Sequence, residues 1–244
     1  MYKEKEIIKN SYRPEIDGIR ALAVISVIIN HFNKELLTSG YLGVDIFFVI
    51  SGYVITSSLA EKSSKNFWDF LFSFFERRIK RIIPALSIYT LIISLLLCMF
   101  SDEPIMLLRT GISSLFGISN FYLLRQSTNY FADSTSLNPF THTWSLSVEA
   151  QFYFIFPLLI WFSGFGKKTK NGYKNIFLIS GIATIFSLIG FIYLYQVNQP
   201  AAYFLMPTRL WEMSTGCLFF IGLKQRKSIA IRLEKLPSQM VLIL

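Results

Sequence analysis

Charged residues are scarce in this sequence. Asp, Glu, Lys and Arg make up 16% of its 244 residues, whereas a soluble domain is usually about a quarter charged. Apolar residues make up 52% of the chain, and the mean hydropathy is +0.46. Several stretches between the charges reach the ~20 residues that cross a hydrocarbon layer of ~30 Å. Because a chain in lipid must pair its own backbone groups, the composition predicts an all-α polytopic membrane protein.

Cysteine is also rare. Cys98 and Cys217 both lie inside apolar stretches, where a reactive thiolate would be costly. They support neither a disulfide framework nor a metal site, and we interpret them as small buried apolar side chains. The sequence also has no phosphate-binding loop and no cluster of metal ligands. No metal and no bound cofactor are therefore expected.

Acidic residues are few beside basic ones, and the net charge is +9. The distribution argues against a nucleic-acid partner, because most of the 24 basic residues lie in short loops between apolar stretches. There they act as topology signals and contact anionic lipid. Most of these basic residues form four clusters, at residues 3–20, 62–81, 167–174 and 224–235.

Charge also predicts the topology. The apolar segments are residues 16–32, 42–60, 82–100, 104–124, 141–163, 175–195 and 203–222, and a further one begins at 240–244. If all seven crossed, the last two basic clusters would lie opposite the first two, against the positive-inside tendency. Segment 104–124 has a proline at its start and Arg109 in its middle, which favours a re-entrant or interfacial piece. We therefore expect a cytoplasmic N-terminus, six complete crossings and a partial further helix.

Polar residues inside apolar segments point to function. Arg20 and His31 lie on the first segment, eleven positions apart, which is roughly 16 Å along a helix and close to three turns. Both side chains therefore project from one face, with the cation nearer the cytoplasm. The alternatives are an interfacial arginine that reaches to the headgroups and a solvated histidine at a helix end.

Two carboxylates lie at the predicted outer ends of other segments. Asp45, between Gly43 and Gly52, could hold an imidazole in the required tautomer, or could simply favour a helix N-terminus. The two glycines suggest close helix approach. Glu149 follows serines that can cap a helix and precedes an apolar span, so we interpret it as a pocket carboxylate.

Basic residues precede the third crossing in the sequence Glu76-Arg-Arg-Ile-Lys-Arg81. They suit either a lipid-anchoring cluster or a phosphate site, because guanidinium groups bind phosphate oxygens in a bidentate way. Arg209 and Glu212 form an i,i+3 pair inside another span, which is structural about as often as functional. Together these residues suit transfer of a group from an internal phosphorylated donor to an external acceptor. The same pattern also fits a proton-coupled transporter.

Five blocks of the sequence, in order, resemble the acyltransferase-3 membrane family. They span residues 13–31, 43–52, 77–85, 142–153 and 207–212. The arginine–ten residues–histidine motif falls on Arg20 and His31, the two-arginine motif on Arg78 and Arg81, and the serine–any–glutamate motif on Ser147 and Glu149.

The resemblance implies a bacterial inner-membrane enzyme. It would move an acyl group, usually acetyl, from cytoplasmic acyl-CoA to a hydroxyl of a surface carbohydrate or lipid-linked glycan. The family often has a second glutamate after Glu149, where this chain has Ala150. It usually has about ten helices, so residues 1–244 are expected to form the N-terminal portion of the domain, without its C-terminal helices.

These considerations assign roles to individual residues. His31 is expected to be the general base or a transient acyl carrier. Arg20, Arg78 and Arg81 would hold the phosphates of coenzyme A, and Glu149 and Asp45 would orient His31 or bind the sugar. The expected acceptor or structural pocket consists of Ser147, Trp144, Arg209 and Glu212. A transporter of an acyl or sugar group and an inactive truncated remnant are the alternatives.

Overall fold

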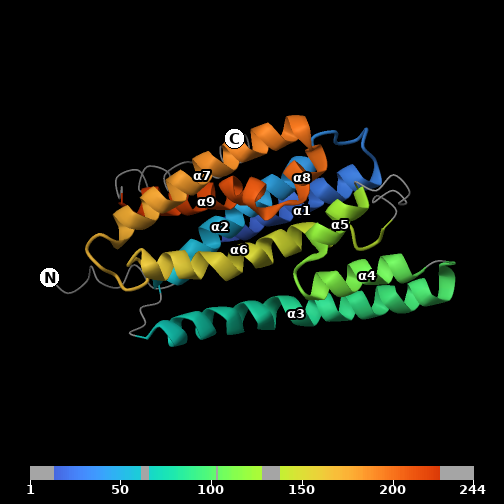
Figure 1. Cartoon of the computed structure of the whole chain (residues 1–244), viewed down its shortest axis with the longest axis horizontal. Coiled ribbons are helices and arrows are strands. Elements are labelled where there is room, and N and C mark those ends of the chain that lie inside the picture. The colour runs from blue at the N-terminus through green and yellow to red at the C-terminus, as the bar shows by residue number, and fades with distance from the viewer. Residues whose placement is uncertain (1–13, 62–65, 103, 128–137, 226–244) are drawn as a thin grey trace.

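A computed structural model describes residues 14–61, 66–102, 104–127 and 138–225. All regular elements of these ranges are helices, as predicted (Figure 1). The long helices are α1 (Pro14–Phe32), α2 (Gly43–Glu61), α3 (Phe67–Phe100), α6 (Thr143–Phe162), α7 (Gly172–Val197) and α9 (Met206–Gln225). The short ones are the 3-10 helix η1 (Gly40–Leu42), α4 (Pro104–Leu115), α5 (Ser119–Ser127) and α8 (Gln199–Phe204). The expected partial helix at 240–244 lies outside the described residues.

The long helices run lengthwise, side by side, and the chain reverses direction between them (Figure 1). The short helices α4, α5 and α8 gather at the end where α3 finishes and α6 begins. Residues Gly40–Ala60 and helices α3, α6 and α7 are long and apolar enough to cross a membrane. Helices α1 and α9 are not among these four, so the six crossings remain a prediction.

Two segment boundaries were predicted wrongly. Helix α3 begins at Phe67 rather than at residue 82, because the Asn66 side chain accepts a hydrogen bond from the Trp68 amide and buried Phe70 and Phe74 continue an apolar face. Its 34 residues extend about 51 Å, so the arginine cluster lies on a helix and not in a loop. Segment 203–222 is divided at Leu205, whose extended backbone separates α8 from α9.

The segment predicted to remain on the outer side forms two helices, α4 and α5. Their 12 and 9 residues extend about 18 and 14 Å, less than the ~30 Å of a bilayer core. Gly117, in the left-handed region with φ +67°, makes the sharp turn before α5. Neither helix is long enough to cross alone.

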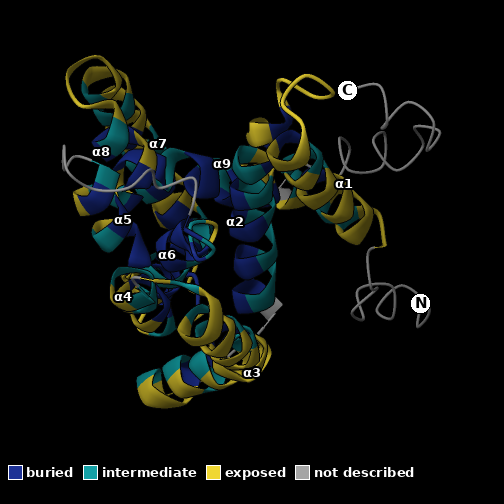
Figure 2. Ribbon diagram, turned by 90° about the vertical axis from the view of Figure 1, so that its right-hand side faces the viewer, coloured by how far each residue is buried: buried dark blue, intermediate teal, exposed yellow. Residues whose placement is uncertain are grey.

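The buried core follows α2, α6 and α9, whereas α1, α3 and α7 present exposed faces (Figure 2). Helices α2 and α9 approach closely through two glycines. A Cβ at Gly52 would lie 1.9 Å from the Met213 carbonyl oxygen, and one at Gly216 would lie 1.9 Å from that of Val49. A Cβ at Gly43 would lie 2.3 Å from the Ala23 oxygen of α1. The close approach predicted at Gly43 and Gly52 is therefore confirmed.

Candidate functional site

A cavity of about 750 Å³ lies between α1, α2, α3 and α6. Its walls place residues from the separate motifs together. The polar residues among them are Asp17, Arg20, Arg78, Arg81, Tyr89, His142, Thr143, Glu149 and Tyr153.

Three arginines line this cavity, Arg20, Arg78 and Arg81, and we call the end at which Arg78 and Arg81 lie the basic end. Arg20 lies 5.2 Å from the centre of the Phe47 ring and 4.0 Å from the Asp17 carboxylate. The Arg78 guanidinium lies 5.3 Å from the centre of the Tyr153 ring. Such stacking orients a guanidinium while leaving its edge available to an anion.

Glu149 is a buried carboxylate on the wall beside the basic end, and only 3% of its surface is exposed. It accepts hydrogen bonds from the Ser51 and Tyr153 hydroxyl groups, and its charge attracts Arg78. A buried carboxylate is costly unless it is paired or hydrogen-bonded. Ser51, Tyr153 and Arg78 supply that compensation.

The opposite end of the cavity, which we call the imidazole end, contains Tyr89 and His142. The two rings meet edge to face with their centres 5.2 Å apart. The Tyr89 hydroxyl donates a hydrogen bond of 2.8 Å to the Pro139 carbonyl. Partial desolvation and the neighbouring charge of His31 lower the pKa of His142 below its ordinary value of 6.5.

Helices α3 and α6 run antiparallel, and their register fixes the length of the cavity. Arg78 lies beside Tyr153 at one end, and Tyr89 lies beside His142 at the other. Each helix advances eleven residues between these contacts, which is about 16 Å. The wall between them is mostly apolar and includes Ile25, Ala85, Leu86 and Leu146.

His31 does not line this cavity. Its side chain is exposed near the end of α1, with Nδ1 2.9 Å from the Val27 carbonyl oxygen. Its charge nevertheless acts on His142, so the two imidazoles lie near the same end of the cavity. The catalytic role of His31 stays a prediction.

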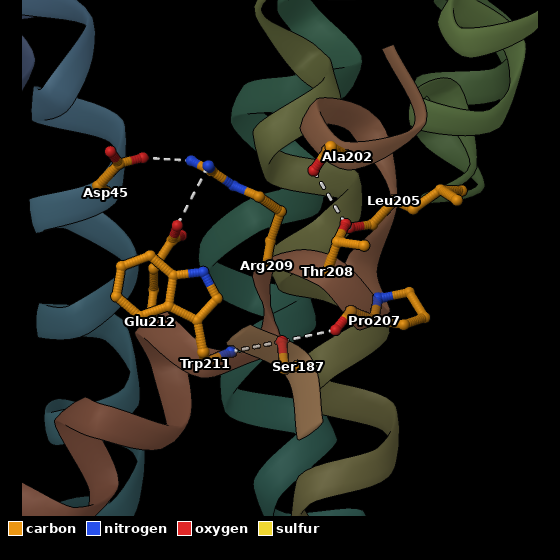
Figure 3. A network of polar contacts seen from close by, with 9 residues as sticks. All are labelled: Asp45, Ser187, Ala202, Leu205, Pro207, Thr208, Arg209, Trp211 and Glu212. Carbon is orange, nitrogen blue, oxygen red and sulfur yellow. Dashed lines mark hydrogen bonds and ion pairs between the residues drawn. The ribbon is translucent and has the colours of Figure 1, made fainter. Parts of the chain in front are cut away.

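Asp45 contacts Arg209 of α9 (Figure 3), and the structure shows no hydrogen bond between Asp45 and His31 in the described residues. The interpretation of Asp45 as the residue that orients His31 is therefore corrected. Arg209 also pairs with Glu212 at 3.2 Å, and we call these three residues the buried ion triad. Asp45 on α2 and Arg209 on α9 carry opposite charges and attract each other, whereas His31 is exposed on α1.

Four aromatic rings surround the Arg209 guanidinium at 5.6 to 5.8 Å, from Phe48, Trp144, Phe191 and Tyr203. Nearby, the Ser187 hydroxyl donates to the Pro207 carbonyl at 2.6 Å and accepts from the Trp211 amide at 2.9 Å (Figure 3). These contacts join α2, α6, α7, α8 and α9 around one charged centre.

Ser147 and Trp144 lie away from the cavity. The Ser147 hydroxyl is 2.7 Å from that of Ser119, a contact that joins α6 to α5. The Trp144 ring packs 4.4 Å from the Tyr203 ring, centre to centre. Ser147 and Trp144 were expected to belong to an acceptor or structural pocket. In the structure both make packing contacts between helices.

Sequence reasoning assigned no role to Tyr153 or His142. Both lie on α6 or at its start, at spacings of four and seven residues from Glu149, which place residues on one helix face. Glu149 was interpreted as a pocket residue, so this spacing was the signal that could have identified the other two.

This chain is similar in sequence to known proteins. A family model described as an acyltransferase domain matches residues 13–235. The O-acetyltransferase OatA of Staphylococcus aureus strain NCTC 8325 is 38% identical over 208 residues, which are 85% of this chain and 34% of the relative. The putative O-acetyltransferase SAS0844 of strain MSSA476 is 38% identical over 212 residues, 86% of this chain and 35% of the relative. The chain thus spans about a third of their length. No solved structure matches.

Proposed function

This chain belongs to the acyltransferase domain family, and on that premise we propose that it carries the donor and transfer site of a membrane O-acyltransferase. The acyl group, acetyl in the simplest case, comes from acyl-CoA on the cytoplasmic side. It passes to a hydroxyl of a carbohydrate, surface-exposed or lipid-linked, on the other face of a bacterial inner membrane.

The observation that carries this proposal is the cavity that joins the basic end to the imidazole end. Coenzyme A is rich in phosphate, and guanidinium groups bind phosphate oxygens in a bidentate way. Arg20, Arg78 and Arg81 supply three such groups on two helices. The apolar wall beyond them suits the uncharged arm and acyl group of the donor.

Glu149 is assigned a positioning role near the donor, because it holds Arg78 and Tyr153 in place. Its carboxylate already accepts a hydrogen bond from the Tyr153 hydroxyl, and Arg78 balances its charge. A carboxylate so placed fixes the guanidinium that binds the donor phosphates, so that the acyl group of the donor is held for attack farther along the cavity. His31 remains a candidate base or acyl carrier at the far end.

Replacing Arg78 with glutamate is expected to raise the KM for acetyl-CoA by about ten- to a hundredfold, because a charge-assisted hydrogen bond contributes about 1.5–3 kcal/mol. The measurement is steady-state transfer at varied acetyl-CoA. The matched control is Lys80→Glu, since Lys80 is exposed and pairs with Glu76 outside the cavity. An unchanged KM in the Arg78 variant would remove the assignment of this arginine to the donor.

A transporter of an acyl or sugar group is the second candidate, because a cavity with polar ends and an apolar middle also suits passage without chemistry. The purified chain in detergent, without any gradient, separates the two. Transfer of radiolabelled acetyl from acetyl-CoA to a sugar hydroxyl supports the acyltransferase. Acetyl-CoA that stays intact, together with gradient-dependent uptake in vesicles, supports the transporter.

A further inference from the structure

The imidazole end of the cavity contains an arrangement that the role of Glu149 does not use. His142 precedes α6, lines the cavity and is exposed to it. Its only aromatic neighbour in the described residues is Tyr89. The proposed donor site lies about 16 Å away along α3 and α6, so His142 has no part in holding the phosphates of the donor.

The Pro139 carbonyl group sets the orientation of the His142 ring. It accepts a hydrogen bond from the imidazole and another from the Tyr89 hydroxyl at 2.8 Å. A neutral imidazole that donates from one nitrogen has a lone pair on the other. A backbone carbonyl and a tyrosine ring therefore orient an imidazole whose second nitrogen has no partner among the described residues and can act as a base.

We infer that His142 is the general base for the acceptor at the imidazole end of the cavity. The inference rests on the proposed function and deepens it by naming the residue that activates the acceptor. As the acceptor hydroxyl oxygen attacks the acyl carbonyl carbon, the free nitrogen of His142 takes the hydroxyl proton. A new carbon–oxygen ester bond forms, the bond from the acyl carbon to the donor breaks, and the leaving group receives the proton.

The groups that face His142 agree with this role. Tyr89 of α3 and His31 of α1 are its titratable neighbours, and no carboxylate lines this end of the cavity in the described residues. The nearby charge of His31 disfavours a second positive charge. Burial and this neighbour lower the pKa of His142 and so favour its neutral form, which a base requires.

The variant His142→Asn tests the inference, because asparagine keeps an N–H donor for the Pro139 carbonyl but has no basic nitrogen. The assay uses the purified chain, radiolabelled acetyl-CoA and dodecyl maltoside, whose sugar headgroup supplies hydroxyl acceptors. Loss of a general base lowers transfer by about 10²–10⁴-fold, while the affinity for acetyl-CoA is unchanged. The control Ser145→Ala removes a hydrogen bond to the His142 carbonyl and leaves the imidazole intact, so its transfer rate equals that of the original chain.

Two results overturn the inference in distinguishable ways. If the original chain and His142→Asn transfer acetyl at the same rate, the proposed function stands and His142 is not the base. If Ser145→Ala loses as much activity as His142→Asn, the effect comes from the start of α6 and not from the imidazole. A chain that transfers no acetyl in any variant contradicts the proposed function itself, and the inference with it.

Discussion

Replacing Glu149 with glutamine is expected to lower acyl transfer by about 10²-fold, because a donor that is slightly misplaced loses the geometry of attack. Glutamine has nearly the same shape and still accepts hydrogen bonds through its carbonyl oxygen. It carries no charge, so it no longer balances the charge of Arg78. Product formation at saturating acetyl-CoA measures the effect.

The control for this variant is Glu35→Gln, since Glu35 is exposed in the connection between α1 and η1 and does not line the cavity. The two variants lose the same formal charge, so a difference between them reports the position of the carboxylate. Binding of acetyl-CoA to the Glu149 variant should be retained. A transfer rate close to that of the original chain would reject Glu149 as the residue that positions the donor.

The second large effect is expected in the buried ion triad. Arg209→Met would leave Asp45 and Glu212 without their cation, and Glu212 is fully buried. Removal of one partner from a buried pair destabilises a protein by about 3–5 kcal/mol. The variant is expected to unfold at a clearly lower temperature in detergent, with less helical signal at the growth temperature.

Arg109→Met is the matched control, because Arg109 lies exposed on α4. A triple variant with Asp45→Asn and Glu212→Gln added to Arg209→Met removes all three charges and should recover part of the loss. Equal unfolding temperatures for the Arg209 and Arg109 variants would show that the triad does not hold α2 against α9.

The sequence predicts the helical class well, because membrane-length apolar runs leave the backbone no alternative. It also singles out Arg20 and Glu149, since charges are costly near lipid, and the family resemblance adds Arg78 and Arg81. All four line one cavity in the structure. Their grouping depends on helix packing, which local patterns do not specify.

The misassigned parts have a common physical cause. Asp45 and Arg209 are 164 positions apart, so a hypothesis built on the first two helices paired Asp45 with the nearest imidazole. Helix α3 was predicted to begin at residue 82, because charged residues in membrane proteins usually belong to loops. The helix begins earlier, because the Asn66 side chain caps its first turn and the Phe74 ring is buried.

The central claim is that an acyl group passes through one cavity, from the basic end to the imidazole end. Sealed vesicles that contain the chain in a single orientation, with radiolabelled acetyl-CoA added only at the face of the chain's N-terminus, test it most directly. A membrane-impermeant sugar is placed only at the opposite face. The account predicts acetylated sugar at that opposite face, and loss of this product with Glu149→Gln. Unmodified sugar there, with acetyl transferred only to acceptors on the side of acetyl-CoA, would contradict it.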